Sequence, residues 1–230
     1  MAMLTVAQAI CLWLGVAMTA SIHFMPVEHQ TSAVTLSVIF FNHLNLFISL
    51  CEITLGLHIS TIQSDYKMLK EHYKGNELEA CIAFLTFPIN GIGELFDGKR
   101  VWSKMWSTYA LYDPSYQNHE SFGFFIDVGN GWTTILPTFI VDLAIIRPDI
   151  MAEYVLLVGC VGIATYWQMM YGALIYYLSY FFNRRYVGKS AAEIAGFVGF
   201  SNSLWVIFPL VGIYASVRVL NDGDFQVYAS

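Results

Sequence analysis

The sequence predicts an all-α integral membrane protein, a helical bundle of five transmembrane helices. Its 230 residues are 57% hydrophobic and only 12% charged, whereas soluble domains carry about 25% charged residues. Apolar stretches that reach the roughly 20 residues needed to cross a bilayer lie near 3–24, 33–62, 121–146, 151–182 and 192–219. These crossings use up the chain, so we expect residues 1–230 to form a single membrane domain.

Two of the apolar stretches need a separate argument. The first begins close to Met1 with no basic residue before it and is followed by "MPVEHQ", so we interpret it as a retained helix and not a cleaved signal. The stretch "ACIAFLTFPINGIGELF" at 80–96 is shorter and contains Pro88. If it crosses the membrane the bundle has six helices, and if it lies at the surface the bundle has five.

Several classes of function are excluded by what the sequence lacks. Its four cysteines, at positions 11, 51, 81 and 160, have no paired spacing, which argues against a disulfide framework and against a zinc site. There is no phosphate loop or dinucleotide fingerprint, and no basic stripe suited to nucleic acid. We therefore expect no metal, no organic cofactor and no nucleic-acid partner, and the lipid bilayer as the surroundings.

Carboxyl groups inside the apolar stretches are the first candidates for function. Glu52 lies in "NLFISLCEITLGL" and Asp127 in "GFFIDVGNGWTTILP". An ionisable residue inside a membrane costs about 2.5–3.5 kcal/mol on insertion scales, so by default it faces an internal cavity; the alternative is that it ties helices together. Asp142 is nearer a helix end, where we expect an interfacial residue. His43 is either a packing residue or a proton carrier.

Aromatic residues crowd into the segment "YWQMMYGALIYYLSYFF" at 166–182. Tyr180, Phe181 and Phe182 fit an interfacial belt, but Tyr171 and Tyr176 lie deeper. Aromatic rings stabilise a cation by about 2 kcal/mol or more where water is excluded. An apolar cavity that combines such rings with buried acids suits carbocation chemistry on a hydrophobic substrate.

A spaced motif then identifies a resemblance. In "MWSTYALYDPSY", Trp106, Tyr109, Asp113 and Tyr116 follow the spacing W-x2-Y-x3-D-x2-Y. This spacing resembles the signature of the emopamil-binding protein family, the sterol Δ8 to Δ7 isomerases of the EXPERA superfamily. Eleven residues beyond the last Tyr that family places a catalytic acid, which the resemblance assigns to Asp127.

Two later segments extend the resemblance over residues 100–218, after two N-terminal transmembrane helices. "YGALIYYLSY" is similar to the family's Tyr-Gly helix. "NSLWVIFP" is similar to its closing N-x-L-W-x-x-x-P segment, which aligns Asn202, Trp205 and Pro209.

The sequence also departs from the family pattern. The family carries an intramembrane H-x3-E before the W-x2-Y segment, and no H-x3-E occurs here. The second acid is then either Glu52 or Glu94, and in the second case Asn90 replaces the His. The central acid is Asp127 where the family has Glu, and Ala173 stands where the family has Asp.

The resemblance implies a cofactor-independent enzyme that protonates an alkene or epoxide of an isoprenoid or sterol-like lipid. Without the family's His, a terpene cyclase of the kind found in fungal meroterpenoid pathways is favoured over a sterol Δ8–Δ7 isomerase. A non-catalytic lipid-binding receptor or chaperone is the third alternative. We expect an integral membrane protein of the endoplasmic reticulum, with a homodimer left open. The expected site consists of the acids Asp127 and Glu52 or Glu94, with Asn202, Trp205, Tyr171, Tyr176, Trp106 and Tyr109 around the substrate.

Overall fold

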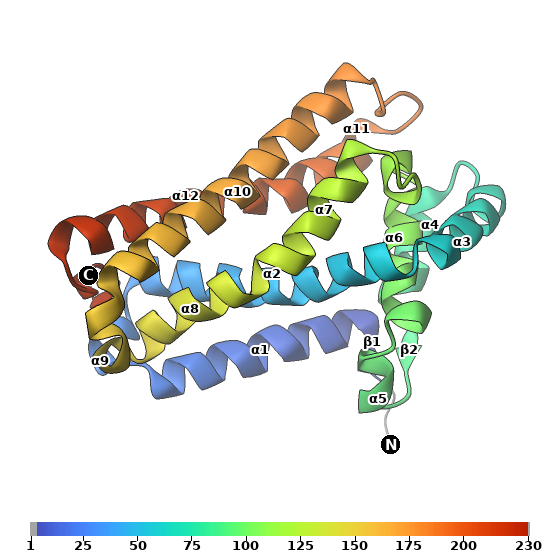
Figure 1. Ribbon diagram of the computed structural model, residues 1–230. Coiled ribbons are helices and arrows are strands. Elements are labelled where there is room, and N and C mark those ends of the chain that lie inside the picture. Colours follow the sequence, from blue (N-terminus) through green and yellow to red (C-terminus); the bar gives the residue numbers. More distant parts are fainter. Residues whose placement is uncertain (1–3, 230) are drawn as a thin grey trace. The chain divides into compact units, whose positions relative to one another are not determined.

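Long helices dominate the structure, a computed structural model that describes residues 4–229 (Figure 1). Within that range, four helical stretches are long and apolar enough to cross a membrane: Val6–Phe24, Ala33–Leu57, Pro148–Phe182 and Ala191–Asp222. A fifth is added if two consecutive helices that meet at a bend of 47°, Phe122–Thr133 and Ile135–Ile146, count as one broken span. The predicted all-α fold with apolar helices of membrane length is therefore confirmed.

The elements follow one another with short connections. The α-helices are α1 Val6–Phe24, α2 Ala33–Leu57, α3 Ile59–His72, α4 Glu77–Leu85, α5 Ile92–Leu95, α6 Ser103–Tyr109, α7 Phe122–Thr133, α8 Ile135–Ile146, α9 Pro148–Met151, α10 Val155–Phe182, α11 Ala191–Glu193 and α12 Ser201–Asp222. Short 3-10 turns occur at Val27–His29, Pro114–Gln117, Ala152–Tyr154 and Gln226–Ala229, and π-helical turns at Gly98–Trp102 and Ile194–Phe200.

The second predicted crossing is shorter than the apolar stretch 33–62. His58, with φ −123° and ψ 28°, leaves helical geometry and separates α2 from α3. α3 carries charged residues on its outer side and buries Ile62 and Tyr66. It is therefore an amphipathic helix and does not continue the candidate span.

Residues 80–96 do not form a helix of spanning length. α4 has nine residues, a rise of about 13 Å against a hydrocarbon core of about 30 Å. The chain then forms strand β2, Pro88–Ile89, which pairs antiparallel with β1, Leu4–Thr5, in the register Leu4 to Ile89 and Thr5 to Pro88. Pro88 ends the helix because its ring is incompatible with a helix interior. The six-helix alternative is therefore not supported.

The chain forms two compact units. Unit 1 consists of Met1–Trp13, Ile48–Trp132 and Tyr176–Ser201, and unit 2 of Leu14–Phe47, Thr133–Ile175 and Asn202–Ser230.

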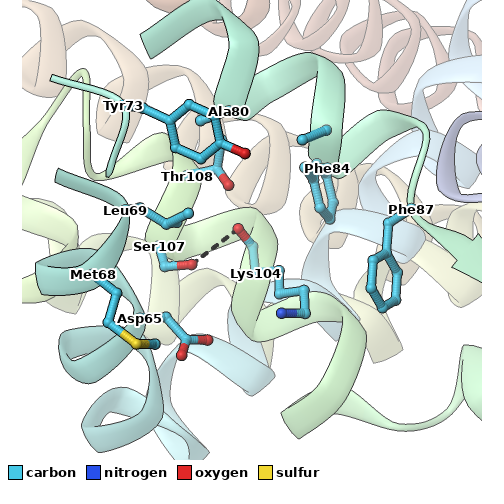
Figure 2. Close-up of a pocket in the computed structure, with 11 residues that line it drawn as sticks. Asp65, Met68, Leu69, Tyr73, Ala80, Phe84, Phe87, Lys104, Ser107 and Thr108 are labelled. Atoms are coloured by element: carbon cyan, nitrogen blue, oxygen red, sulfur yellow. Dashed lines mark hydrogen bonds between the residues drawn. The ribbon is translucent and has the colours of Figure 1, made fainter. Parts of the chain in front are cut away.

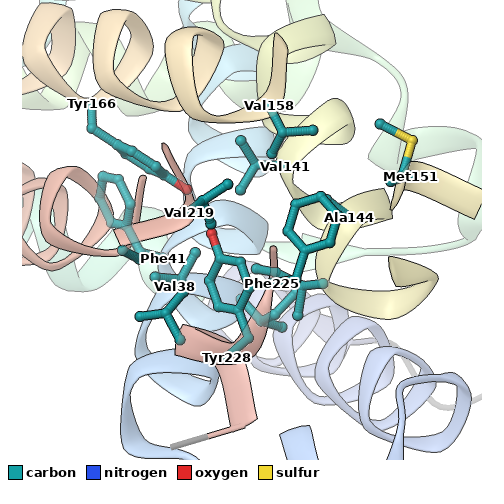
Figure 3. Close-up of a cluster of buried hydrophobic side chains, with 14 of the residues drawn as sticks. Val38, Phe41, Val141, Ala144, Met151, Val158, Tyr166, Val219, Phe225 and Tyr228 are labelled. Carbon is teal, nitrogen blue, oxygen red and sulfur yellow. The ribbon is translucent and has the colours of Figure 1, made fainter. Parts of the chain in front are cut away.

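Unit 2 is built around a hydrophobic cluster (Figure 3). Side chains from α2, α8, α10 and α12 fill it, and Tyr228 from the last turn of the chain lies fully buried among them. The Thr35 hydroxyl donates a 2.6 Å hydrogen bond to the Tyr228 carbonyl. The C-terminal turn is therefore anchored to α2.

Candidate active site

The W-x2-Y-x3-D-x2-Y motif folds into a cluster of aromatic rings in unit 1. Trp106 stacks on Tyr116 with ring centroids 5.2 Å apart, and Tyr109 meets Tyr116 edge-on at 5.0 Å. Tyr176 of α10 joins them: its ring lies 6.0 Å from Tyr116, and its hydroxyl is 3.3 Å from that of Tyr109. These distances are typical of interacting aromatic pairs. Residues 60 positions apart in the sequence thus form one aromatic cluster, which we define as Trp106, Tyr109, Tyr116 and Tyr176.

The aromatic cluster is fastened to α2 beside Glu52. The indole N–H of Trp106 donates a 2.6 Å hydrogen bond to the carbonyl of Cys51. A buried indole needs such an acceptor, and here the acceptor belongs to the residue before Glu52. The hydrogen bond therefore ties Trp106 to the residue that precedes Glu52 in the sequence.

Close packing of α7 against α2 places Asp127 in the same region. A Cβ atom at Gly131 would lie 2.8 Å from the Glu52 Cβ and 2.9 Å from the backbone of Ser49 and Ile53. Only a residue without a side chain fits there, as is common where membrane helices approach closely. One turn earlier on α7, Asp127 is carried toward the same part of α2.

The carboxyl groups of Glu52 and Asp127 lie close enough to influence each other's charge. Glu52 is 3% exposed, and its Oε2 atom has no hydrogen-bond partner in the described chain. It interacts electrostatically with Asp127. Asp127 is half-buried and also interacts with the hydroxyl of Tyr116. Of the three acids that the sequence nominated, Glu52 and Asp127 interact with each other, and Asp127 also interacts with Tyr116 of the aromatic cluster.

Tyr116, which lies outside the candidate spans, responds to this environment. Its burial, followed by the nearby acidic groups of Asp127, Tyr109 and Asp113, raises its pKa well above the usual value. The phenol therefore stays protonated and is a hydrogen-bond donor to Asp127.

The Asp of the motif has a positioning role that the sequence did not indicate. Asp113 is fully buried; its Oδ1 accepts a 2.9 Å hydrogen bond from the Ser115 backbone N–H, and its Oδ2 pairs with Arg185 at 3.0 Å. Arg185 also donates to the Ser179 hydroxyl at 3.0 Å. These contacts hold the turn that presents Tyr116. Arg185 was missed because it stands in an ordinary basic pair after a helix, and only the fold brings it to Asp113.

Glu94 lies elsewhere in unit 1. Its carboxyl group forms a 2.9 Å ion pair with Arg100 and accepts hydrogen bonds from the backbone and side chain of Asn90. The Asn90 backbone N–H, with further help from Arg100, lowers its pKa. Of the two glutamates that the sequence left open, Glu52 is the one that interacts with Asp127.

Tyr171 does not share the surroundings of Tyr176. It is 49% exposed and stacks on Trp167 with centroids 6.1 Å apart. Five residues on a helix rotate a side chain by about 140° from its starting direction, given 3.6 residues per turn. Tyr171 belongs to unit 2 and Tyr176 to unit 1, so the predicted substrate role of Tyr171 stays a prediction.

Trp205 and Asn202 belong to unit 2. The indole N–H of Trp205 donates a 3.2 Å hydrogen bond to Asn45 Oδ1, and its ring meets Phe41 edge-on at 5.7 Å. Asn202 is half-buried near the start of α12. Within its own unit Trp205 is a packing and hydrogen-bonding residue, and the predicted substrate roles of both residues stay predictions.

A second buried carboxyl group, that of Asp142, forms a polar network in unit 2. Asp142 is 4% exposed, which corrects the expectation of an interfacial residue. Asn42 donates a 2.6 Å hydrogen bond to it and accepts one of 2.8 Å from the Tyr166 hydroxyl. His43 lies 3.9 Å from its Oδ2 and bonds to Ser21 at 2.7 Å. Asn42 and His43 are single polar residues in an apolar stretch. Their pattern in the sequence therefore did not indicate that they contact Asp142.

The comparisons add no family assignment. The sequence matches no protein-family model and no curated protein. Within residues 4–229, no three His, Cys, Asp or Glu side chains gather in a way that could hold a metal ion.

Proposed function

We propose that this protein is an integral membrane enzyme of the EXPERA type that protonates an alkene or epoxide of an isoprenoid lipid in the endoplasmic reticulum. One observation carries the proposal: the carboxyl pair Glu52 and Asp127 lies against the aromatic cluster of Trp106, Tyr109, Tyr116 and Tyr176. Acids beside aromatic rings in an apolar surrounding provide the two things that carbocation chemistry needs.

The residues divide the reaction into three steps. Asp127 donates its proton either to one carbon of the alkene, which leaves a cation on the other carbon, or to the epoxide oxygen, whose C–O bond then breaks to give an alcohol and a cation on the freed carbon. The faces of the aromatic cluster stabilise that cation while the chain closes a ring. A C–H bond next to the final cation then breaks, and Glu52 accepts the proton. The two carboxyl groups influence each other electrostatically, and return of the proton from Glu52 to Asp127 regenerates the acid.

Cyclisation of a prenyl chain is the reaction that this arrangement supports best. A sterol Δ8 to Δ7 isomerisation must add and remove protons at two separate carbons, and the family's His is replaced here. The second candidate is nevertheless that isomerase, because the W-x2-Y-x3-D-x2-Y residues that resemble the sterol isomerases are the same ones that form the cluster.

The test separates the candidates by product. Microsomes that contain the protein are incubated with epoxidised and olefinic prenyl substrates, and lipids are analysed by mass spectrometry. We expect cyclised products, and their loss in Asp127→Asn at unchanged protein level. The second arm is expression in a yeast strain that lacks its own sterol isomerase. Restored Δ7 sterols would show that the protein is a sterol isomerase and not a cyclase. Saturable binding of cationic amphiphiles without any product would instead indicate a lipid-binding receptor or chaperone.

A further inference from the structure

A separate cavity lies between α3, α4 and α6 of unit 1, in helices that are not among the candidate spans (Figure 2). Its volume is about 210 Å³, below the roughly 300–1,000 Å³ of pockets for drug-sized ligands. It therefore accommodates a small group and not a whole isoprenoid. The lining residues are Asp65, Met68, Leu69 and Tyr73 with Ala80, Ala83, Phe84 and Phe87, and Lys104, Ser107 and Thr108.

Two residues of opposite charge line this cavity and do not form an ion pair with each other. Asp65 of α3 and Lys104 of α6 project toward the same part of the cavity (Figure 2). Within residues 4–229 neither side chain makes an ion pair; the Lys104 ammonium instead lies 5.4 Å from the centre of the Phe87 ring. Elsewhere in unit 1 comparable charges are paired, as in Lys189 with Glu77 at 2.9 Å. The negative carboxylate of Asp65 and the positive ammonium of Lys104 are therefore complementary to a ligand that carries one positive and one negative charge.

We propose that this cavity binds a phosphoethanolamine group. The phosphate pairs with Lys104, and the ammonium group, which has N–H donors, pairs with the Asp65 carboxylate. The hydroxyl of Thr108 is a further donor at the wall. The glycerol end of the ligand leaves along the apolar side chains of Phe84 and Phe87. A phosphate alone leaves Asp65 unmatched, and a choline group has no N–H to donate to it.

The position of the cavity favours a lipid as the source of this group. α3 follows the candidate span α2 after a single residue, His58, so the cavity lies close in the chain to where a helix of membrane length ends. Lys104, Ser107 and Thr108 share α6 with Trp106 and Tyr109 of the aromatic cluster. The site is nevertheless independent of the proposed enzyme activity, since none of the cavity residues belongs to the carboxyl pair or the aromatic cluster.

The experiment measures lipid retention by the full-length protein. The protein is placed in phosphatidylcholine nanodiscs that contain equal small amounts of phosphatidylethanolamine and phosphatidylglycerol, and co-purified lipids are counted by native mass spectrometry. We expect at least fivefold enrichment of phosphatidylethanolamine, lost in Lys104→Met and in Asp65→Asn. Lys67→Met, on the exposed side of α3, is the matched control and should retain the lipid.

Two further arms decide among the outcomes. Soluble glycerophosphoethanolamine should compete only weakly; strong competition would keep the ligand chemistry but move its source from the bilayer to solution. The charge-reversed double variant, Asp65→Lys with Lys104→Asp, should recover part of the enrichment if the charges act as a pair. Equal retention of phosphatidylglycerol, or enrichment that survives both single variants, would overturn the proposal. Unchanged helical circular dichroism excludes misfolding as the cause of a loss.

Discussion

The two buried carboxyl groups Glu52 and Asp142 have opposite surroundings. In unit 1, Glu52 interacts with a second carboxyl group, Asp127, which is only half-buried and adjoins aromatic rings. In unit 2, Asp142 is bonded by the amide of Asn42 and enclosed by the hydrophobic cluster. Two acids that lie close together gain little for stability, whereas an acid within a hydrogen-bond chain joins helices. Burial of a carboxyl group alone therefore does not distinguish a catalytic acid from a structural one, and the group with which it interacts has to be considered.

The same change from Asp to Asn in both units tests whether the acid of unit 1 is catalytic and the acid of unit 2 is structural. Asp127→Asn should reduce turnover by about 10²–10⁴-fold, the range for loss of a general acid, because the amide has no proton to give. Asp142→Asn keeps the oxygen that accepts from Asn42 and should retain turnover. Product formation per mole of purified protein checks both. Equal turnover losses in the two variants would remove the distinction between the regions.

The contact between α7 and α2 is tested by a glycine pair on one helix. Gly131→Ala would push a Cβ to within 3 Å of Glu52 and of the α2 backbone, whereas nothing lies within 4 Å of a Cβ at Gly129. Since a shift of about 1 Å at a catalytic group costs on the order of 10²-fold in rate, we expect turnover to fall toward that extent in Gly131→Ala. Gly129→Ala should remain near wild type. If both variants behave alike, α7 does not position Asp127 through this contact.

The structural role of the Asp142 network predicts a loss of stability. Asn42→Leu leaves the Asp142 carboxyl group and the Tyr166 hydroxyl without their shared partner. An unsatisfied buried group costs about 1–3 kcal/mol, so the variant should unfold at a clearly lower temperature in detergent. Thermal unfolding followed by circular dichroism measures this. A stable but inactive Asn42→Leu protein would place the catalytic function in unit 2.

The anchor of the aromatic cluster predicts a smaller effect. Trp106→Phe removes the hydrogen bond to the Cys51 carbonyl but keeps an aromatic ring, which costs about 1 kcal/mol for one hydrogen bond. We expect a modest fall in thermal stability and a loss of turnover of about tenfold or less, the rate change that 1.36 kcal/mol of barrier brings. Trp102→Phe, which loses a similar bond to the Leu95 carbonyl, is the control. It should lower thermal stability by a similar amount and leave turnover unchanged. A larger loss of turnover in the control would show that the anchor is not specific.

The smallest effect is expected at Glu94. Its ion pair with Arg100 has a half-exposed arginine partner, and such pairs are screened by water and salt. Glu94→Gln should therefore keep turnover within about twofold. The same assay with Glu52→Gln, where we expect a loss near that of Asp127→Asn, provides the contrast. Loss of activity in Glu94→Gln alone would reverse the assignment of the second acid.

The membrane-length helices, the candidate acids and the aromatic motif could be predicted because each depends on residues close together in the sequence. A run of apolar residues must be helical to satisfy its backbone in lipid, so the membrane-length helices were predictable. Glu52 and Asp127 stood out as charges in such runs, and the spacing of Trp106, Tyr109 and Tyr116 marked one motif. The end of α2 at His58, before the apolar run ends, could not be predicted, because propensity does not locate a break between two helices. The short α4 was one of two alternatives that Pro88 left open.

Composition and spacing were enough to predict the class of fold, Asp127 with two candidate partner acids, Glu52 and Glu94, and most of the aromatic residues. Only the tertiary structure decided which glutamate meets Asp127, that Arg185 holds Asp113, that Tyr171 lies on the exposed side, and that Asp142 is buried in a network with Asn42. Each of these depends on a contact between residues distant in the chain, whose energy comes from packing and desolvation that no local pattern records.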